Sequence, residues 1–406
     1  MKVRRSERIR RYLVGALALL LAPLLVLSLP ALSFAQSPAA SDAPAPATAS
    51  PPPPATEKPP PLLAPVPAAA TAPATATATD AVPASAPARD AVPLALVLPL
   101  ESPVYGRAAE AVKAGFAAAA NAADTRYTVV AHGDDGVVAA FAKATGAGAR
   151  VVVGPLVRDD LKAIATAGGA LPWTIALNQL DESSALPERV FTLALAVESE
   201  GVQLARRANA DGVRTVVIIG SDAPLQKRFA GAFTGEWILL GGAPPLTFLL
   251  DRSPDMLALL RREVKRAAPD AVLLAVDAQE AALVRPYLGQ ATAYTSSQVN
   301  DRQSRESLRE LDAVHFVELP WLADPSAAAF GRIARPEYGS TILERLYALG
   351  IDAFRLSAQL LGRADEVDLD GVTGRLRVSA SGRGAVDREA LLAEYRDGVL
   401  VPLDAQ

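Results

Sequence analysis

The sequence contains no cysteine and only two histidines, His132 and His315. Without cysteine there can be no disulfide bond, thiolate metal ligand, cysteine nucleophile or cysteine-linked lipid anchor. Two histidines are too few for a histidine-based metal site. The apolar run 312–319 surrounds His315, so we expect a core histidine rather than a catalyst. Asp134 and Asp135 follow His132 without a third spaced oxygen ligand, and we expect no calcium or other metal site there.

Neither sign of charge is in large excess. The chain has 40 basic and 44 acidic residues and a formal net charge of −4. A strongly basic face of the kind that binds nucleic acid is therefore not expected. Common catalytic motifs are also missing, including G-x-x-x-x-G-K-[ST], G-x-S-x-G, H-E-x-x-H and S-x-x-K, and no complete G-x-G-x-x-G follows a strand. We expect no cofactor and no enzymatic activity.

Residues 1–35 have the pattern of an export signal. An arginine-rich start precedes the apolar stretch Leu13–Leu29, and small residues around Ala35 offer a cleavage site before Gln36. The alternative is an uncleaved inner-membrane anchor, because the apolar stretch approaches the length that spans a bilayer. Either interpretation places the rest of the chain outside the cytoplasm, which in a bacterium is the periplasm.

Residues 36–90 form a linker rich in proline and alanine. Such a segment buries too little apolar surface to offset the entropy of ordering, so we expect disorder with polyproline II character. Two interpretations stay open. The linker could be a spacer that lets the folded part reach a partner, or it could have no role beyond connection.

From residue 91 onward, short apolar runs alternate with helical patterns. This alternation predicts parallel strands joined by right-handed βαβ crossovers. The predicted strands are 94–100, 127–132, 150–156, 173–178, 214–220, 245–250, 270–276, 291–296 and 312–319. The helical patterns are 105–122, 135–145, 158–168, 199–210, 224–235, 255–267, 278–288 and 341–361.

Nine strands are many for one open sheet, so we predict an α/β fold with two lobes. Each lobe would be a doubly wound, mostly parallel sheet. We expect one domain over 91–406, with lobe 1 at about 91–198 plus returning segments and lobe 2 at about 199–320. The segment after the helix 341–361 resembles a terminal strand pair.

Polar side chains follow several of the predicted strands. Ligands of open α/β sheets bind beyond the carboxyl ends of the strands, so these side chains could hydrogen-bond a small polar ligand in a cleft between the lobes. The alternative is that they only cap helices and end strands, where such residues are common anyway. The candidate residues are Ser102, Tyr105, Asn178, Gln179, Ser221, Ser297 and Gln298.

Beyond these patterns, the chain resembles a known family over about 91–406. The stretches that carry the resemblance are collinear with it, and include LVLPLESPVYGRAAEAVKAGFAAA, VVVGPLVRDDLKAIA, WTIALNQ, AYTSSQ, FVELPWL, ERLYALGIDAFRL and GVTGRLRVSASGRG. They resemble the type I periplasmic-binding-protein domains and, more narrowly, the LppC family of penicillin-binding-protein activators. The TSSQ, PWL, ALGIDAF and TGRL elements are the more specific ones.

This resemblance implies a two-lobe periplasmic domain that is not an enzyme. It implies docking on a class A penicillin-binding protein and stimulation of peptidoglycan cross-linking. Two features depart from the family pattern. Family members carry a lipidated cysteine, which this sequence lacks, and the longer members have an N-terminal helical-repeat domain where this chain has its Pro/Ala linker.

Two other functions are weighed against the activator. A solute-binding protein of this fold would capture an amino acid or a related small polar ligand, and peptidoglycan fragments are a further possible ligand. An enzyme is the third class, and the missing motifs oppose it.

Overall fold

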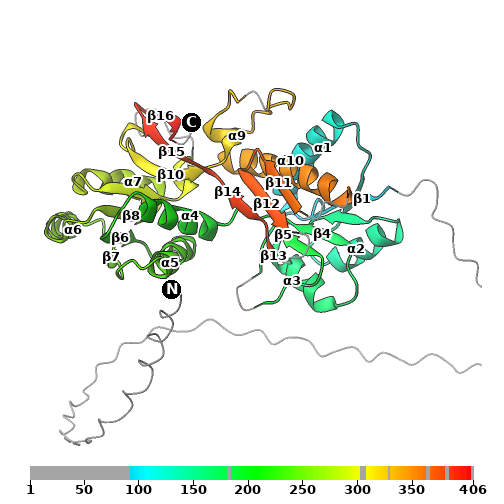
Figure 1. The fold of residues 1–406 in the computed structure, drawn as a ribbon, viewed down its shortest axis with the longest axis horizontal. Helices are drawn as coiled ribbons and strands as arrows, with labels where there is room; N and C mark the ends of the chain where they lie inside the picture. The colour runs from blue at the N-terminus through cyan, green and yellow to red at the C-terminus, as the bar shows by residue number, and fades with distance from the viewer. Residues whose placement is uncertain are drawn as a thin grey trace, which may run out of the picture. The chain divides into compact units, whose positions relative to one another are not determined.

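The computed structural model describes residues 92–180, 184–301, 308–327, 330–362, 366–379 and 384–403. The predicted export signal, 1–35, and the predicted linker, 36–90, lie outside the described residues. The described part contains two α/β sheets and a small antiparallel sheet (Figure 1). This confirms the predicted α/β class with two mostly parallel sheets. The domain boundaries given above stay predictions.

The lobe 1 sheet has the strand order β13-β5-β4-β3-β1-β2, and every pairing in it is parallel. Its short strands are rich in valine, isoleucine and leucine, as strands covered on both faces should be. The strands are β1 (Leu94–Leu98), β2 (Thr128–Ala131), β3 (Val151–Val153), β4 (Trp173–Ala176), β5 (Val190–Thr192) and β13 (Gly384–Ala385).

Helices cover both faces of the lobe 1 sheet. Because successive strand residues point to opposite faces, Leu94, Leu96 and Leu98 pack with α1 and α10, while Ala95 and Val97 pack with α2 and α3. These helices are α1 (Gly106–Ala122), α2 (Val137–Gly146), α3 (Arg158–Ala167) and α10 (Thr341–Leu361).

The lobe 2 sheet has the order β16-β15-β10-β9-β8-β6-β7. The pairings from β10 to β7 are parallel, and β15 and β16 add an antiparallel hairpin at one edge. The strands are β6 (Val216–Gly220), β7 (Leu246–Leu249), β8 (Ala271–Ala275), β9 (Thr292–Thr295), β10 (Val314–Glu318), β15 (Leu391–Arg396) and β16 (Val399–Pro402).

Two pairs of helices cover the lobe 2 sheet. Side chains of α4 and α5 pack on one face in a core that contains the fully buried Trp237, and those of α6 and α7 pack on the other face. Both lobes are therefore doubly wound. The helical segments are α4 (Val197–Ala210), α5 (Pro224–Leu239), α6 (Pro254–Ala267), α7 (Ala278–Val284), η1 (Arg285–Tyr287), η2 (Ser297–Val299) and α9 (Pro320–Ala323).

The segment after α10 ends in a strand pair, the antiparallel hairpin of β15 and β16, and contains further strands before it. It first forms an antiparallel sheet, the C-terminal sheet, in the order β11-β12-β14. It also supplies β13 to the lobe 1 sheet and the hairpin of β15 and β16 to the lobe 2 sheet. Short strands broken by glycines give little periodicity to read, which is why the sequence indicated fewer strands. The new bounds are β11 (Glu366–Asp370), β12 (Arg375–Ser379) and β14 (Asp387–Glu389).

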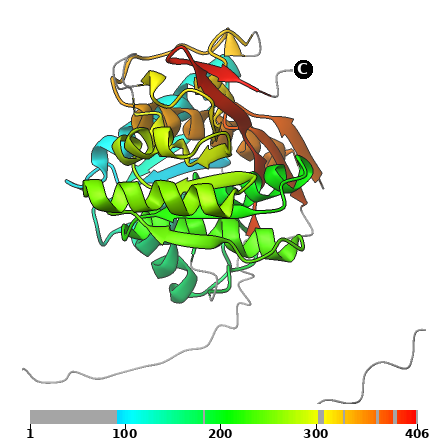
Figure 2. The same cartoon turned by 90° about the vertical axis from the view of Figure 1, so that its left-hand side faces the viewer.

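Helix α10 belongs with lobe 1 although it follows strands of lobe 2. It packs closely against α1, and a glycine on each helix permits the approach. A Cβ on Gly115 would lie 1.9 Å from the Tyr347 carbonyl oxygen, and a Cβ on Gly350 would lie 2.1 Å from the Val112 carbonyl oxygen. The chain thus crosses between the lobes three times, after β5, after β10 and after β14. The last crossing runs along the orange and red segments in Figures 1 and 2.

In the part of the chain that the structure describes, no helix combines the length and the apolar character needed to cross a membrane.

Candidate functional site

A cavity of about 550 Å³ lies where the three crossovers between the lobes meet. Its wall includes residues just beyond β3, β4 and β9, the strand ends at which α/β sheets bind ligands. The crossovers themselves contribute Ala194 to Ala196, Glu318 with Leu319, and Arg388 with Ala390. The volume is in the range of small-molecule sites.

Four of the seven predicted site residues line this cavity: Asn178, Gln179, Ser297 and Gln298. Asn178 Nδ2 donates to the Leu156 carbonyl oxygen at 3.0 Å, and its Oδ1 accepts the Gln179 amide at 2.9 Å. These bonds fix the loop beyond β4. The structure brings the four residues together, and their role in ligand binding stays a prediction.

The other three predicted residues do not line the cavity. Ser102 is 4 % exposed, and its Oγ accepts the amides of Val104 at 3.3 Å and Tyr105 at 3.1 Å, just before α1 begins. Tyr105 is the residue before α1 and is 42 % exposed. Ser221 donates its amide to the Ala275 carbonyl oxygen at 3.0 Å. Ser102 thus stabilises the turn before α1, which is the structural role that the sequence offered as the alternative to ligand binding.

A buried ion pair in the cavity wall was missed by the sequence analysis. The Arg345 guanidinium donates from Nη2 to Glu318 Oε2 at 2.6 Å and from Nε to Glu318 Oε1 at 3.1 Å. Asn300 Nδ2 and the Leu319 amide also donate to the Glu318 carboxylate, at 2.7 and 2.9 Å. The carboxylate is therefore fully hydrogen-bonded, as a buried charge requires.

Arg345 also connects lobe 1 to lobe 2. It lies on α10, and its Nη2 donates to the Ser297 carbonyl oxygen at 2.8 Å, at the start of η2. Burial lowers the pKa of Arg345, but the carboxylates of Glu318 and Glu200 outweigh burial, and the pKa is higher than the ordinary value of arginine. The guanidinium is therefore charged at every physiological pH.

Glu200 on α4 holds the same turn from the other side. Its Oε1 accepts the Ser297 hydroxyl and its Oε2 accepts the Ser297 amide, both at 2.7 Å. Burial raises the pKa of Glu200, although the two bonds from Ser297 and the charge of Arg345 act in the opposite direction. Ser297, a predicted site residue, is thus held between an arginine and a carboxylate.

Both missed residues lie inside stretches that carry the family resemblance. Glu318 is in FVELPWL, and Arg345 is in ERLYALGIDAFRL. A charged residue at the end of an apolar strand was the available signal, because a charge is rarely buried unless it is paired. The sequence did not indicate which opposite charge would pair with it.

The two family-specific elements ALGIDAF and TGRL contact each other. Asp352 of ALGIDAF is fully buried on α10, and its carboxylate accepts the Val372 amide at 3.0 Å, the Thr373 amide at 2.7 Å and the Thr373 hydroxyl at 2.6 Å. Thr373 belongs to TGRL. A Cβ on Gly371 would lie 2.3 Å from Asp352 Oδ2, so the turn needs glycine there. The two elements together fasten the C-terminal sheet to α10.

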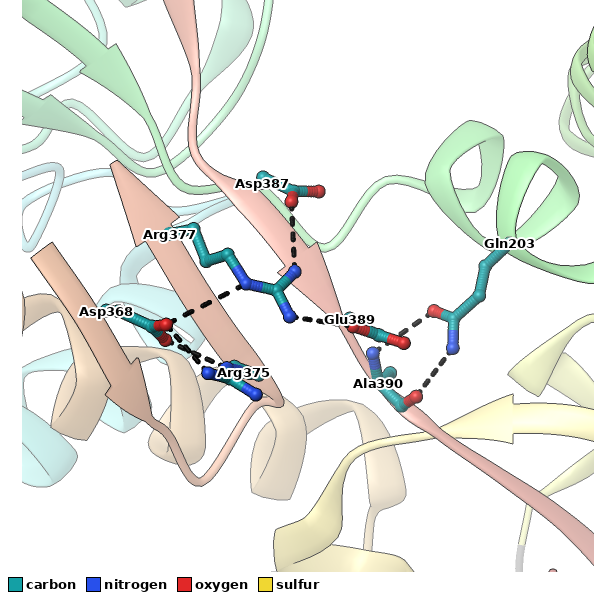
Figure 3. A network of polar contacts seen from close by, with 7 residues as sticks. All are labelled: Gln203, Asp368, Arg375, Arg377, Asp387, Glu389 and Ala390. Carbon is teal, nitrogen blue, oxygen red and sulfur yellow. Dashed lines mark hydrogen bonds and ion pairs between the residues drawn. The ribbon is translucent and has the colours of Figure 1, made fainter. Parts of the chain in front are cut away.

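Figure 3 shows how the last crossover is attached to lobe 2. The Gln203 side chain on α4 donates from Nε2 to the Ala390 carbonyl oxygen at 2.6 Å and accepts the Ala390 amide on Oε1 at 3.1 Å. The primary amide thus satisfies both backbone groups of the residue between β14 and β15. This bidentate contact fixes the strand beside the cavity.

In the described residues no group of three or more histidine, aspartate or glutamate side chains is placed to hold a metal ion.

Two lobes of doubly wound sheet, three crossovers and a cavity between them define a type I periplasmic-binding-protein-like fold. Solved structures agree. A protein described as a putative branched-chain amino acid ABC transporter from Chromobacterium violaceum is 34 % identical, with a TM-score of 0.66 over 74 % of this chain and 99 % of that chain. The C-domain of LpoA (YraM) from Haemophilus influenzae, described as a regulator of PBP1A, is 25 % identical, with a TM-score of 0.66 over 76 % and 99 %.

The family model described as "LppC putative lipoprotein" matches residues 65–246 and 255–398. The chain belongs to this LppC family, as its sequence pattern indicated. Relatives include the penicillin-binding protein activator LpoA of Haemophilus influenzae, 26 % identical over 274 residues, which are 65 % of this chain and 47 % of the relative. The LpoA protein of Pasteurella multocida is 25 % identical over 322 residues, 77 % of this chain and 55 % of the relative. The chain thus spans about half the length of these curated relatives.

Proposed function

We propose that this protein is a non-catalytic periplasmic activator of peptidoglycan synthesis that acts by contact with a class A penicillin-binding protein. In this proposal it is exported by its N-terminal segment. The proposal rests on one observation above others. The two-lobe unit matches, over 99 % of that chain, the C-domain of a protein described as a regulator of PBP1A.

The arrangement of the described residues supports a binding role. The charged groups that line the cavity include hydrogen-bonded pairs that fix the lobes, such as Glu318 with Arg345. The motif elements ALGIDAF and TGRL form the contact between Asp352 and Thr373 that holds the C-terminal sheet on α10. These are the contacts of a scaffold that presents a surface.

The test is a cross-linking assay with lipid II. The full chain, purified in detergent, is added to a class A penicillin-binding protein of the same organism, and cross-linked product is measured with and without it. We expect stimulation at stoichiometric amounts and direct binding to the synthase. Absence of both stimulation and binding would overturn the proposal.

A second candidate function is the capture of a small polar solute, such as an amino acid. The similarity to the protein described as a branched-chain amino acid ABC transporter favours it. A thermal melt against amino acids and muropeptides separates the two functions. A ligand at a hundredfold excess over its dissociation constant stabilises the folded state by about 2.7 kcal/mol. A solute-binding protein should show such a gain without any effect on the synthase.

A further inference from the structure

The cavity between the lobes has a nearly balanced set of charges. Four arginines and three glutamates line it: Arg158, Arg228, Arg345 and Arg388, and Glu198, Glu200 and Glu318. Two of the arginines have carboxylate partners of their own. Arg345 pairs with Glu318 at 2.6 Å, and Arg228 pairs with Glu198 at 3.1 Å.

Arg388 differs from these paired arginines. Its described contact is a bond from Nη1 to the Thr373 carbonyl oxygen at 3.1 Å. Its Nε is buried and has no hydrogen-bond partner among the described residues, and no carboxylate there lies within ion-pair distance. A buried guanidinium donor without an acceptor is costly. Nε itself is closed off from the cavity, but Arg388 as a residue is partly exposed and lines the cavity, so a ligand could reach the remaining part of its guanidinium.

The strand fixes the direction of Arg388. In β14, Asp387 and Glu389 lie on the exposed face, where both pair with Arg377 (Figure 3). Alternation along a strand turns Arg388 to the opposite face. There it stands across from Leu376, which is fully buried, because directly paired residues share a face. The side chain therefore points away from the face that carries Arg377, and the partly exposed Arg388 lines the cavity.

Burial lowers the pKa of Arg388, and the carboxylates of Glu200, Glu318 and Asp352 offset part of that effect. The nearby carboxylates also limit what could bind. They would repel a dianion more strongly than a monoanion. Carboxylate geometry matches the guanidinium fork, and the polar residues Asn178 and Gln179 line the same cavity.

We infer that the cavity between the lobes binds a small monocarboxylate and that Arg388 is the residue that receives its carboxylate. The ligand would be a hydroxy acid or an N-acylated amino acid, the latter either free or as the C-terminal unit of a short peptide. This site is independent of the proposed contact with a penicillin-binding protein, so either conclusion can fail without the other.

The test compares acids with their neutral amides. Isothermal titration calorimetry on the full chain uses lactate, N-acetyl-L-alanine and N-acetyl-D-alanine against lactamide and N-acetylalaninamide, with inorganic phosphate as a dianion. Losing a charge-assisted hydrogen bond costs at least about tenfold in affinity. We expect at least one acid to bind at least about tenfold more tightly than its amide, and phosphate to bind more weakly than that acid. Equal binding of acids and amides, or no binding of any acid at millimolar concentration, would overturn the inference.

Two variants assign the contact to Arg388. Arg388→Gln should remove the preference for the acid over the amide, and Arg388→Lys should retain part of it, because lysine keeps the charge but loses the fork. Arg377→Gln is the matched control, since Arg377 faces solvent on the neighbouring strand, and it should bind like the unaltered chain. Retention of the full acid preference in Arg388→Gln would refute the assignment. If that variant does not fold, the Arg388→Lys titration decides, and unchanged affinity there would refute it as well.

Discussion

Two clusters of arginine and carboxylate in this protein have nearly the same geometry in different surroundings. In the cavity wall, Arg345 and Glu318 approach to 2.6 Å with side chains that are 9 % and 0 % exposed. On the open face of the C-terminal sheet, Arg375 and Asp368 approach to 2.7 Å with side chains that are 51 % and 46 % exposed (Figure 3). Distance alone would give both pairs the same importance.

Burial separates the two clusters. On the sheet, water and salt screen the charges, and an unpaired ion is readily solvated, so each pair contributes little. In the cavity wall, removing both ions from water is unfavourable, and this free energy is offset because both carboxylate oxygens of Glu318 accept hydrogen bonds. Removing one partner of a buried pair therefore destabilises the protein far more than replacing both partners by apolar side chains would.

The two clusters also differ in what they connect. Arg345 joins α10 of lobe 1 to the ends of β9 and β10 in lobe 2, through Ser297 and Glu318. The sheet cluster joins only strands β11, β12 and β14 of one small sheet. The buried cluster thus fixes the place where the lobes meet, and the exposed cluster covers a surface.

The largest effect is expected at Arg345. Arg345→Met removes one partner of a buried pair and leaves the Glu318 carboxylate without its counter-ion. We expect the free energy of unfolding to fall by about 3–5 kcal/mol. Urea unfolding followed by circular dichroism and by tryptophan fluorescence measures the loss.

A double variant tests the cause of that loss. Arg345→Met combined with Glu318→Gln removes the unpaired charge, and the glutamine oxygen can take the place of one of the two carboxylate oxygens, which accept from Asn300 and from the Leu319 amide respectively. It should recover a large part of the stability that Arg345→Met alone loses. A double variant no more stable than the single one would show that lost packing, and not an uncompensated charge, causes the effect.

Sequence reasoning predicted the repeating architecture well, because strands buried on both faces have a strong signal. The nine apolar runs from 94–100 to 312–319 each contain one of the strands β1 to β4 or β6 to β10, and the eight helical patterns match α1 to α7 and α10. It also identified the family, since the motif elements are short, specific and collinear. The segment after α10 was harder, because its short strands are divided among three different sheets.

The site was only partly predictable. Asn178 and Ser297 follow strands that end at the cavity. They were predicted because ligands of open α/β sheets bind beyond the carboxyl ends of the strands. Ser102 and Ser221 also follow strands, but β1 and β6 end away from the cavity lining. Arg388 could not be found in this way. Its position depends on a three-residue strand whose pairing with β12 is visible only in three dimensions.

A second effect concerns the pH dependence of the buried cluster. The folded-state pKa of Glu200 is raised by burial, so the folded state favours the protonated carboxyl more than the unfolded state does. Its contribution to stability is fully present below the ordinary pKa of glutamate and is lost as the pH rises through the raised value. Relative to Glu200→Gln, which cannot titrate, the unaltered chain should therefore lose stability between acidic and neutral pH.

Urea unfolding of both chains at a series of pH values measures this difference. Asp270→Asn provides a contrast of opposite sign, because the amides of Arg214 and Thr215 hold the pKa of the exposed Asp270 carboxyl below its ordinary value. A stability difference between the unaltered chain and Glu200→Gln that does not change with pH, or that grows in favour of the unaltered chain as the pH rises, would contradict the role assigned to burial.

The smallest effect is expected on the exposed cluster. Arg375→Gln removes one member of a pair whose two side chains are about half exposed, and Asp368 keeps Arg377 within 4.0 Å as a second cation. Water solvates the released carboxylate, so the urea midpoint should change little at low salt and not measurably at high salt, where the Debye length is about 3 Å at 1 M. The same unfolding assay compares it with Arg345→Met. A loss for Arg375→Gln as large as that for Arg345→Met, persisting at high salt, would show that geometry and not burial governs these pairs.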